Sequence, residues 1–294
     1  MATLYTHQSE NVRRTWFLMT FFFGVVIAIG FVFAQIYGNP NILYGFFAFS
    51  IIMNIVAYWK SDKIAISQAG AVLADETQYR ELHNIVENLA ITAGLPKPKV
   101  YIINDPAPNA FATGRNKDHA AIAVTTGILQ ILDKTELEGV IAHELSHVGN
   151  RDILVSTVAV VLAGFISIVA NVFMRSSLFA GGSSDDSKRS NVIFVIIGLA
   201  LSIIAPLFAT LLQLAISRKR EYLADASGAI LTRYPEGLAS ALQKIGEYSQ
   251  PMKKQSAAIS HLFLADPKGK TSFISKLFMT HPPIEDRIKA LLLK

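Results

Sequence analysis

The sequence predicts a mainly α-helical integral membrane protein with a small β-sheet, and three observations lead to this fold class. Hydrophobic residues make up 51% of the 294 residues and charged residues only 17%, a composition too apolar for an ordinary soluble domain. Four long apolar runs divide the chain, as about four transmembrane helices would. Between the second and third runs, short segments with the alternation of β-strands precede a segment with helical periodicity.

The first two apolar runs predict an N-terminal transmembrane hairpin over residues 1–59. They extend from Thr15 to Gln35 and from Ile42 to Trp59, and a short uncharged turn separates them. The first run is longer than the roughly 7–15 residues of a signal-peptide core, so an uncleaved anchor is expected. Arginines and lysines lie outside both ends of the hairpin and none lies in its turn. The positive-inside rule therefore puts both ends in the cytoplasm.

Residues 60–152 have the pattern of the first part of a soluble domain. Apolar residues at helical spacing predict a helix over Gln78–Thr92. The segments Lys99–Ile103 and Ala120–Thr126 predict two strands, and Asn109–Gly114 predicts a weaker one. In Ala120–Thr126 the large apolar residues Ile122 and Val124 point to one side and smaller residues to the other, so this strand is expected to have one well-packed face.

The third and fourth apolar runs predict a second transmembrane hairpin over residues 153–216. They extend from Ile153 to Met174 and from Val192 to Ile216, around a loop rich in Gly and Ser. Basic residues on this loop weaken the topology signal, so the hairpin either crosses the membrane fully or lies partly buried against the soluble domain. Residues 217–294 are polar again and mainly helical by pattern, and they predict the second part of the soluble domain.

The segment from His143 to His147 reads H-E-L-S-H and carries the clearest chemical signal. A helix completes a turn in about 3.6 residues, so two imidazoles four positions apart share one face and can hold one metal ion. Glu144 lies beside that face, where its carboxylate can act as a base toward water at the metal. Two surface or capping histidines would share this spacing, but the chain has only 7 histidines. The pattern therefore predicts the zinc-binding helix of a metalloprotease.

A third ligand is expected after the fourth apolar run. The chain has no cysteine, so zinc must be held by histidine and carboxylate, and two His with one Glu is a known set. Glu221 can supply that carboxylate, and Asp225, one helical turn later, can hold the second ring nitrogen of a liganding imidazole. Two spans separate Glu221 from His143, which returns Glu221 to the same side of the membrane. The alternative is a charged residue at the membrane edge, paired with Arg218 or Arg220.

Together these segments resemble the HtpX family of membrane-embedded zinc metalloproteases, which is related to the CAAX prenyl proteases. The resemblance covers almost the whole chain, including the apolar N-terminal hairpin. Its motifs in chain order are Asn109–Ala112, Thr126-Gly127, His143–His147, Glu221 with Asp225, and His281-Pro282. It implies a gluzincin-like protease domain with one zinc per chain, held by His143, His147 and Glu221. Glu144 would be the general base.

The resemblance also implies substrates and a location. It implies hydrolysis of peptide bonds in misfolded or damaged membrane proteins, or other unfolded polypeptides, as part of bacterial protein quality control. The protein would be multi-pass in the bacterial inner membrane, surrounded by the lipid bilayer, with its catalytic domain facing the cytoplasm. Nucleic acid is not expected as a partner despite the net charge of +5, because the basic residues gather beside the apolar runs. The oligomeric state stays open.

The resemblance further implies an edge strand beside the active-site cleft. An extended substrate would add to this strand through backbone hydrogen bonds. The residues concerned are Asn109, Ala110, Phe111 and Ala112. Without the resemblance, Phe111 would be assigned to the core and Asn109 to a turn.

Two residues near the C-terminus are candidates for transition-state stabilisation. The C-terminal segment resembles that of the same family, in which a His and an Arg face the cleft. His281 and Arg287 occupy the matching positions. Their charge would stabilise the anionic tetrahedral intermediate. The alternative is a helix start with Pro282 or Pro283 in its first turn, and Arg287 paired with a carboxylate.

Two other functions fit parts of the pattern. The first is a membrane transporter or channel, but the apolar runs carry almost no ionisable residues, which a transport pathway usually needs. The second is a membrane protein that binds metal without catalysis, but such a site would not require Glu144. Peptide hydrolysis accounts for all of these residues.

Overall fold

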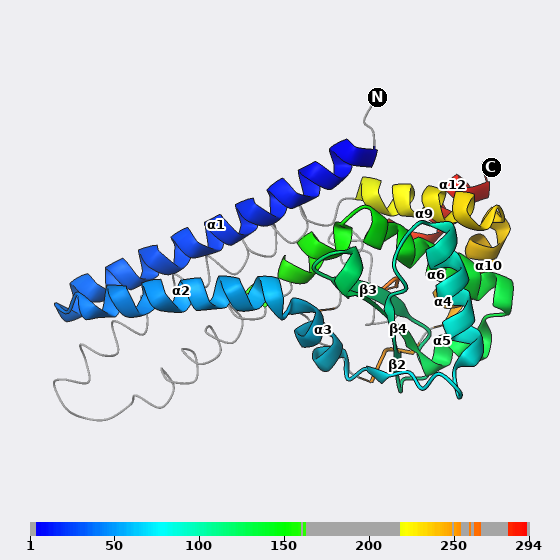
Figure 1. The fold of residues 1–294 in the computed structure, drawn as a ribbon, viewed down its shortest axis with the longest axis horizontal. Helices are drawn as coiled ribbons and strands as arrows, with labels where there is room; N and C mark the ends of the chain where they lie inside the picture. The colour runs from blue at the N-terminus through cyan, green and yellow to red at the C-terminus, as the bar shows by residue number, and fades with distance from the viewer. Residues whose placement is uncertain are drawn as a thin grey trace.

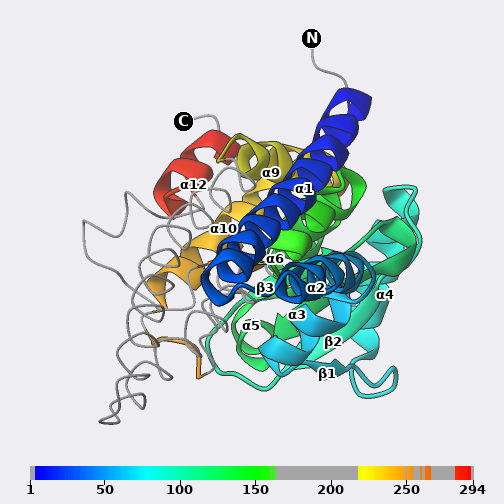
Figure 2. The ribbon, with the colours of Figure 1, turned by 90° about the vertical axis from the view of Figure 1, so that its left-hand side faces the viewer.

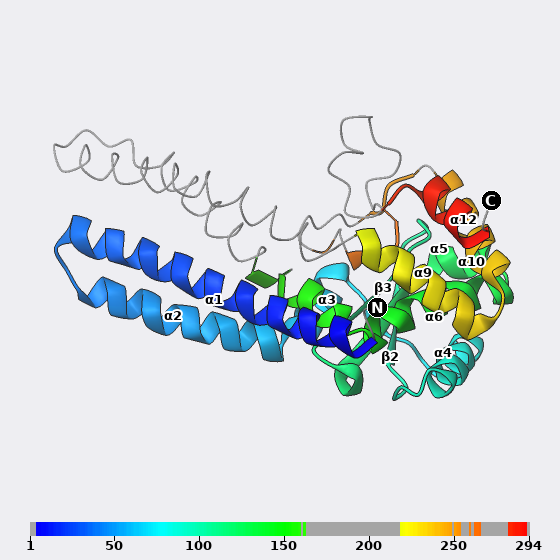
Figure 3. The same ribbon diagram turned by 90° about the horizontal axis from the view of Figure 1, so that it is seen from above.

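The computed structural model describes residues 4–159, 161–162, 218–248, 250–253, 259, 262–265 and 282–292. A long helical hairpin is made of α1 (Leu4–Tyr37) and α2 (Asn41–Trp59). It projects from a compact head, which is formed by the described residues within 61–151, 218–265 and 282–292 (Figure 1). Seen from above, hairpin and head lie end to end, with the first residues of α1 beside the head (Figure 3).

Both helices of the hairpin are long and apolar enough to cross a membrane. The candidate spans are Ser9–Gln35, with a mean hydropathy of 2.6, and Asn41–Trp59, with 1.8. Only 28% and 17% of their most apolar windows are buried inside the structure, whereas a core helix of a soluble protein would be mostly buried. Large apolar side chains such as Trp16, Phe31 and Ile52 are exposed instead, as expected for a surface that contacts lipid. Two of the expected membrane helices thus have candidates among the described residues.

Little of the second predicted hairpin belongs to the described residues. Residues 152–159 and 161–162 are helical, and residues 163–216 lie outside the described part of the chain. The expected total of four membrane helices therefore stays a prediction, as does the division of the chain after residues 59, 152 and 216.

The head contains a four-stranded sheet in the order β1-β2-β4-β3. Its strands are β1 (Val72–Leu73), β2 (Lys99–Ile103), β3 (Ala110–Gly114) and β4 (Ala120–Thr125). The central pair β2–β4 is parallel, and the pairs β1–β2 and β3–β4 are antiparallel. β3 is thus an edge of this sheet. The three strands predicted from sequence are present to within one residue at each end, whereas β1 was too short for its pattern to be recognised.

The one-sided packing expected for residues 120–126 is wrong, because every residue of β4 is buried. Ile122 and Val124 belong to the main core. Ala121 and Ala123 pack on the other face, in a second cluster that includes Phe111 and residues of α3 (Ser61–Ala69). The small alanine side chains leave room for that helix and for this reason gave no sign of a second packed face.

α6 (Lys134–Gly149) passes through the middle of the head. Besides α3 and the short 3-10 helix η1 (Lys117–His119), the head also contains α4 (Arg80–Thr92), α5 (Thr126–Ile131), α9 (Arg218–Thr232), α10 (Pro235–Glu247) and α12 (Ile284–Leu292). A capping box fixes the start of α6, since the Asp133 side chain accepts from the Glu136 N–H and the Glu136 side chain accepts from the Asp133 N–H. The Glu136 carboxylate also accepts from Lys244 of α10 at 2.7 Å. α6 is therefore held between the sheet and the helices α9 and α10 (Figure 2).

Candidate metal centre

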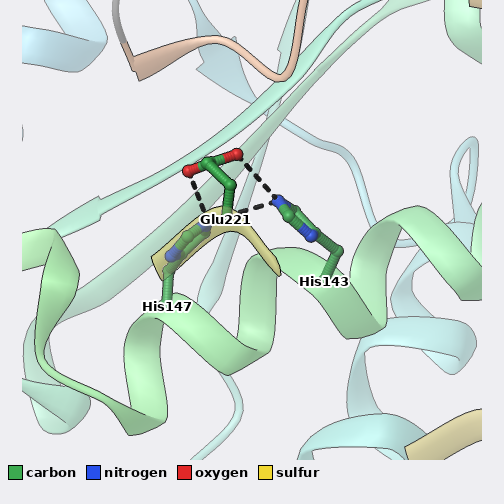
Figure 4. Close-up of side chains that lie close together, drawn as sticks. All are labelled: His143, His147 and Glu221. Carbon is green, nitrogen blue, oxygen red and sulfur yellow. Dashed lines mark hydrogen bonds and ion pairs between the residues drawn. The ribbon is translucent and has the colours of Figure 1, made fainter. Parts of the chain in front are cut away.

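Three side chains from two helices that are distant in sequence meet at one point. His143 and His147 come from α6 and Glu221 from α9, and one ligand atom of each lies within 4.8 Å of the others. The two Nε2 atoms are 3.2 Å apart. The Glu221 carboxylate is 3.8 Å from Nε2 of His143 and 3.6 Å from Nε2 of His147. Figure 4 shows the carboxylate and both rings turned toward one another.

This donor set fits zinc. Zinc ligands about 2.0–2.1 Å from the ion in a tetrahedron lie about 3.4 Å from one another, close to the 3.2, 3.6 and 3.8 Å between these atoms. His143 and Glu221 are only 1% and 3% exposed. A carboxylate buried to this extent requires a compensating charge, and two imidazoles with one carboxylate are a ligand set typical of catalytic zinc.

An aspartate holds the far nitrogen of each imidazole. Nδ1 of His143 lies 2.9 Å from Oδ1 of Asp225, and Nδ1 of His147 lies 3.0 Å from Oδ2 of Asp152. Such carboxylates fix the orientation of the ring and direct Nε2 toward a metal. Burial lowers the pKa of His147, but the hydrogen bond with Asp152 and the charges of Glu221 and Asp152 outweigh it and raise this pKa to about 9.

Asp225 lies where the sequence predicted it, whereas Asp152 was missed. Asp152 follows His147 by five positions, so the helical spacing that revealed Asp225 does not apply to it. Arg151 has a φ of 58°, and this left-handed residue turns the chain back so that Asp152 faces His147. The signal available in the sequence was a carboxylate directly before a long apolar run, where a charge is costly without a partner.

Glu144 lies beside the metal-binding group and is buried. The backbone N–H of Ala112 in β3 lies close to its carboxylate and favours the charged form. Burial raises the pKa of Glu144, and the charge of Glu221 adds to this effect, so that the two histidines and the Ala112 N–H offset it only in part. A carboxyl group with a raised pKa is suited to taking up and releasing a proton near neutral pH.

Arg287 is fully buried and pairs with Asp225 through two hydrogen bonds. Its Nε donates to Oδ2 at 2.9 Å and its Nη2 to Oδ1 at 2.7 Å, and Nη1 lies 3.8 Å from the Glu221 carboxylate. Burial raises the pKa of Asp225, but the charge of Arg287 and its hydrogen bonds outweigh this and lower the pKa to about 2. Arg287 thus contacts the outer partner of His143, while His281 lies outside the described residues.

β3 forms one wall of the site, and part of its outer edge is already paired. The Ala110 carbonyl accepts from the Leu264 N–H at 2.9 Å. The Asn109 amide donates to the Ala265 carbonyl at 2.9 Å and accepts from the Ala265 N–H at 3.1 Å. Phe111 is buried and packs in the second cluster of the core. Of the four residues expected to receive substrate, Ala112 is the one that contacts Glu144.

Comparisons with known proteins identify the family of this chain. Residues 76–293 match peptidase family M48. The chain is 50% identical over 294 residues to a protein named protease HtpX homolog from Caldanaerobacter subterraneus subsp. tengcongensis, covering 98% of this chain and 97% of the relative. It is 46% identical over 280 residues to a protease HtpX homolog from Pyrococcus furiosus, covering 95% and 94%. The crystal structure of S. mikatae Ste24p has a similar fold, with a TM-score of 0.52 and 18% identity over 98% of this chain and 67% of that one.

The family match covers most of the chain, and the relatives are similar along nearly their whole length. The M48 peptidases are zinc metalloproteases, which agrees with the group of two histidines and one glutamate found here. The chain therefore belongs to peptidase family M48, among the HtpX proteases, and is a membrane metalloprotease.

Proposed function

We propose that this protease binds one zinc ion per chain through His143, His147 and Glu221, and hydrolyses peptide bonds of misfolded or damaged membrane proteins. The observation that carries the proposal is the convergence of these three side chains, from two helices, within 4.8 Å of one another. When bound there, zinc would supply Lewis-acid polarisation of a substrate carbonyl and would lower the pKa of water.

Glu144 is the proposed general base. Its carboxylate lies next to both imidazoles, and its pKa is raised by burial. In the reaction it would take a proton from the attacking water and pass that proton to the nitrogen of the leaving amine. Because water attacks the carbonyl carbon directly, the enzyme needs no covalent intermediate. Asp225 and Asp152 would keep the two imidazoles oriented during the cycle.

Substrate would bind as an extended strand along β3. This strand is an edge of the sheet, and the Ala112 N–H on its outer side contacts Glu144. Backbone pairing is sequence-independent, which suits a protease that removes many different damaged proteins. The contacts of residues 264–265 with Asn109 and Ala110 limit the available edge to the part around Ala112.

Arg287 is better supported as a positioning residue than as a group that stabilises the tetrahedral intermediate. Two of its nitrogens donate to Asp225, and Asp225 in turn holds His143. Stabilisation of the oxyanion by His281 stays a prediction from the sequence.

The proposed location is the bacterial inner membrane, with four spans and the head in the cytoplasm. The exposed apolar surface of α1 and α2 and the basic residues at both ends of their hairpin support this orientation. Arg115 of the head lies 4.6 Å above the Trp59 ring at the end of α2. A tryptophan at a helix end is typical of the interface between membrane and water, so this contact would keep the head close to the bilayer.

The direct test is the degradation of an unfolded membrane protein by the purified full-length chain. Cleavage should require one equivalent of zinc and should stop when a chelator removes the metal. A transporter or a structural metal-binding protein would produce no new peptide termini under either condition. Persistent cleavage with no bound metal would contradict the proposal.

Zinc binding should depend on pH because a ligand carries a proton. Zinc binds the neutral imidazole, and the pKa of His147 is raised to about 9 by Asp152 and Glu221 against the effect of burial. Below this pKa a proton must leave when zinc binds, so the affinity should fall up to about tenfold for each unit by which the pH is lowered. Competition with a coloured chelator at several pH values measures this. Asp152→Asn should flatten the dependence, and an equally steep dependence in that variant would argue against this origin.

The close approach of α9 to α6 should also control metal affinity. A Cβ atom added at Gly228 of α9 would lie 3.0 Å from the His143 backbone nitrogen and 3.2 Å from its Cα. Gly228→Ala gains about 1 kcal/mol of helix propensity against an overpacking cost of about 1–3 kcal/mol, so the free energy of unfolding should fall by about 0–2 kcal/mol. The two helices must move apart, however, which shifts Glu221 away from the histidines.

We therefore expect weaker zinc binding in Gly228→Ala, with the chain still folded and its melting temperature lowered by only a few degrees. Gly149→Ala is the matched control, because its Cβ would meet only Leu95 at 3.9 Å. Equal zinc affinities in the two variants would show that the helix separation does not set the position of Glu221.

A further inference from the structure

A buried polar cluster lies where α1 meets the head. Asn11 of α1 is 3% exposed and Asp152 is 4% exposed. The Asn11 Nδ2 donates to Oδ1 of Asp152 at 2.8 Å and to the Asn150 carbonyl at 2.9 Å. The Asn11 Oδ1 accepts from Nη1 of Arg220 at 3.1 Å, and the same nitrogen donates to Oδ1 of Asp152 at 3.1 Å. Three segments that are far apart in the sequence are thus joined by polar contacts.

The two oxygens of Asp152 are divided between this cluster and the metal centre. Oδ1 accepts from Asn11 and Arg220, whereas Oδ2 lies 3.0 Å from Nδ1 of His147. A carboxylate is planar, so fixing one oxygen also fixes the direction in which the other accepts. The contacts of Asn11 and Arg220 therefore determine how Asp152 meets His147.

Asp152 needs these partners to hold its place. It follows a turn with a left-handed residue at Arg151, so the regular hydrogen bonds of α6 do not position it. A buried carboxylate is also costly without several hydrogen bonds. Loss of Asn11 would remove one of the two donors described for Oδ1 and would leave the other, Arg220.

The second imidazole has a comparable arrangement that lies within the head. Asp225 holds His143 and is fixed by Arg287 of α12. Each imidazole thus has an aspartate, and each aspartate has an arginine. Among the described residues, only the arrangement around His147 includes a side chain of the membrane hairpin.

We infer that the N-terminal membrane helix completes the metal centre, with Asn11 acting as a positioning residue for His147 through Asp152. This inference depends on the proposed zinc site and deepens it. Metal affinity would therefore depend on how α1 packs against the head. A displacement of the hairpin would weaken the hold on the metal, although the hairpin contributes none of the three ligands.

The test compares zinc affinity in full-length variants of α1. Asn11→Leu keeps the number and branching of the side-chain heavy atoms and removes all three polar contacts. It should weaken zinc binding about tenfold, the lower end of the effect of losing an outer partner of a ligand. Thr15→Val is the matched control, because Thr15 is also buried on α1, one turn further along, and its hydroxyl donates to the Asn11 carbonyl. We expect zinc affinity within about twofold of wild type for this control.

Cobalt(II) in place of zinc provides a readout that a merely structural defect would not change. Its visible absorption depends on ligand geometry, so the spectrum should change in Asn11→Leu and stay as in wild type in Thr15→Val. If Asn11→Leu does not fold, Asn11→Asp decides the question. It keeps the size and the acceptor for Arg220 but replaces the donor to Asp152 by a carboxylate oxygen, so it should also weaken zinc binding.

The outcomes separate this inference from the proposed function. Wild-type zinc affinity and cobalt spectrum in the folded Asn11 variants, with weakened binding in Asp152→Asn, would overturn the role of α1 and leave the metal site intact. Wild-type affinity in both Asp152→Asn and Glu221→Gln would overturn the metal site itself, and the inference with it.

Discussion

Replacing Glu144 with glutamine should abolish proteolysis while leaving zinc bound. The amide has the size of the carboxylate but cannot accept a proton, and a positioned general base contributes about 10²–10⁴-fold to the rate. Glu144 is not among the three residues whose ligand atoms converge, so the metal content should stay at one per chain. The measurement is the initial rate of cleavage of an unfolded membrane protein, with metal content determined on the same sample.

Glu138→Gln is the matched control for this variant. Glu138 belongs to the same helix and is also acidic, but it is only partly buried and is not part of the converging group. Its substitution should leave both the rate and the metal content unchanged. Normal turnover by Glu144→Gln would exclude Glu144 as the base and would require another proton acceptor.

Replacing Glu221 with glutamine should remove both the metal and the activity. The neutral amide is a weak zinc ligand, and no cysteine is present to substitute for it. Loss of an outer partner costs about 10–100-fold in affinity, so loss of a direct ligand should cost more than about 100-fold. Titration against a competing chelator measures the effect, and the melting temperature shows whether the chain remains folded.

Asp225→Asn is the reference variant with which the loss of zinc affinity in Glu221→Gln is compared. Asp225 lies one turn further along α9 and contacts His143 instead of the metal position. Its substitution should weaken zinc binding by about 10–100-fold, less than that of Glu221. If the two variants had equal affinities, or if Glu221→Gln bound zinc as wild type does, Glu221 would not be a ligand.

Elements with a regular pattern were predictable from the sequence. The apolar runs of α1 and α2, the alternation in β2 and the histidine spacing in α6 each depend on neighbours in the chain. The helix α3 and the strand β1 were missed because they are too short to establish a period. The second packed face of β4 was missed because alanine is compatible with both a buried and an exposed position.

The residues of the candidate site were likewise predictable only where their spacing in the chain forms a local pattern. Local spacing predicted His143, Glu144 and His147 as site residues, and also paired Glu221 with Asp225 one turn apart. Asp152, Arg220 and Asn11 were not identified, since their contacts join residues separated by 5, 68 and 141 positions. Arg287 was identified as a functional candidate, but its pairing with Asp225 became visible only in the fold.

The sequence by itself predicted a membrane metalloprotease, because the spacing of two histidines on one helix and long apolar runs are properties of neighbouring residues. Only the tertiary structure decided which aspartate contacts which imidazole, and that Asn11 of the N-terminal hairpin contacts Asp152. These contacts depend on how separate helices pack, and packing is set by the shapes of surfaces that no single segment contains.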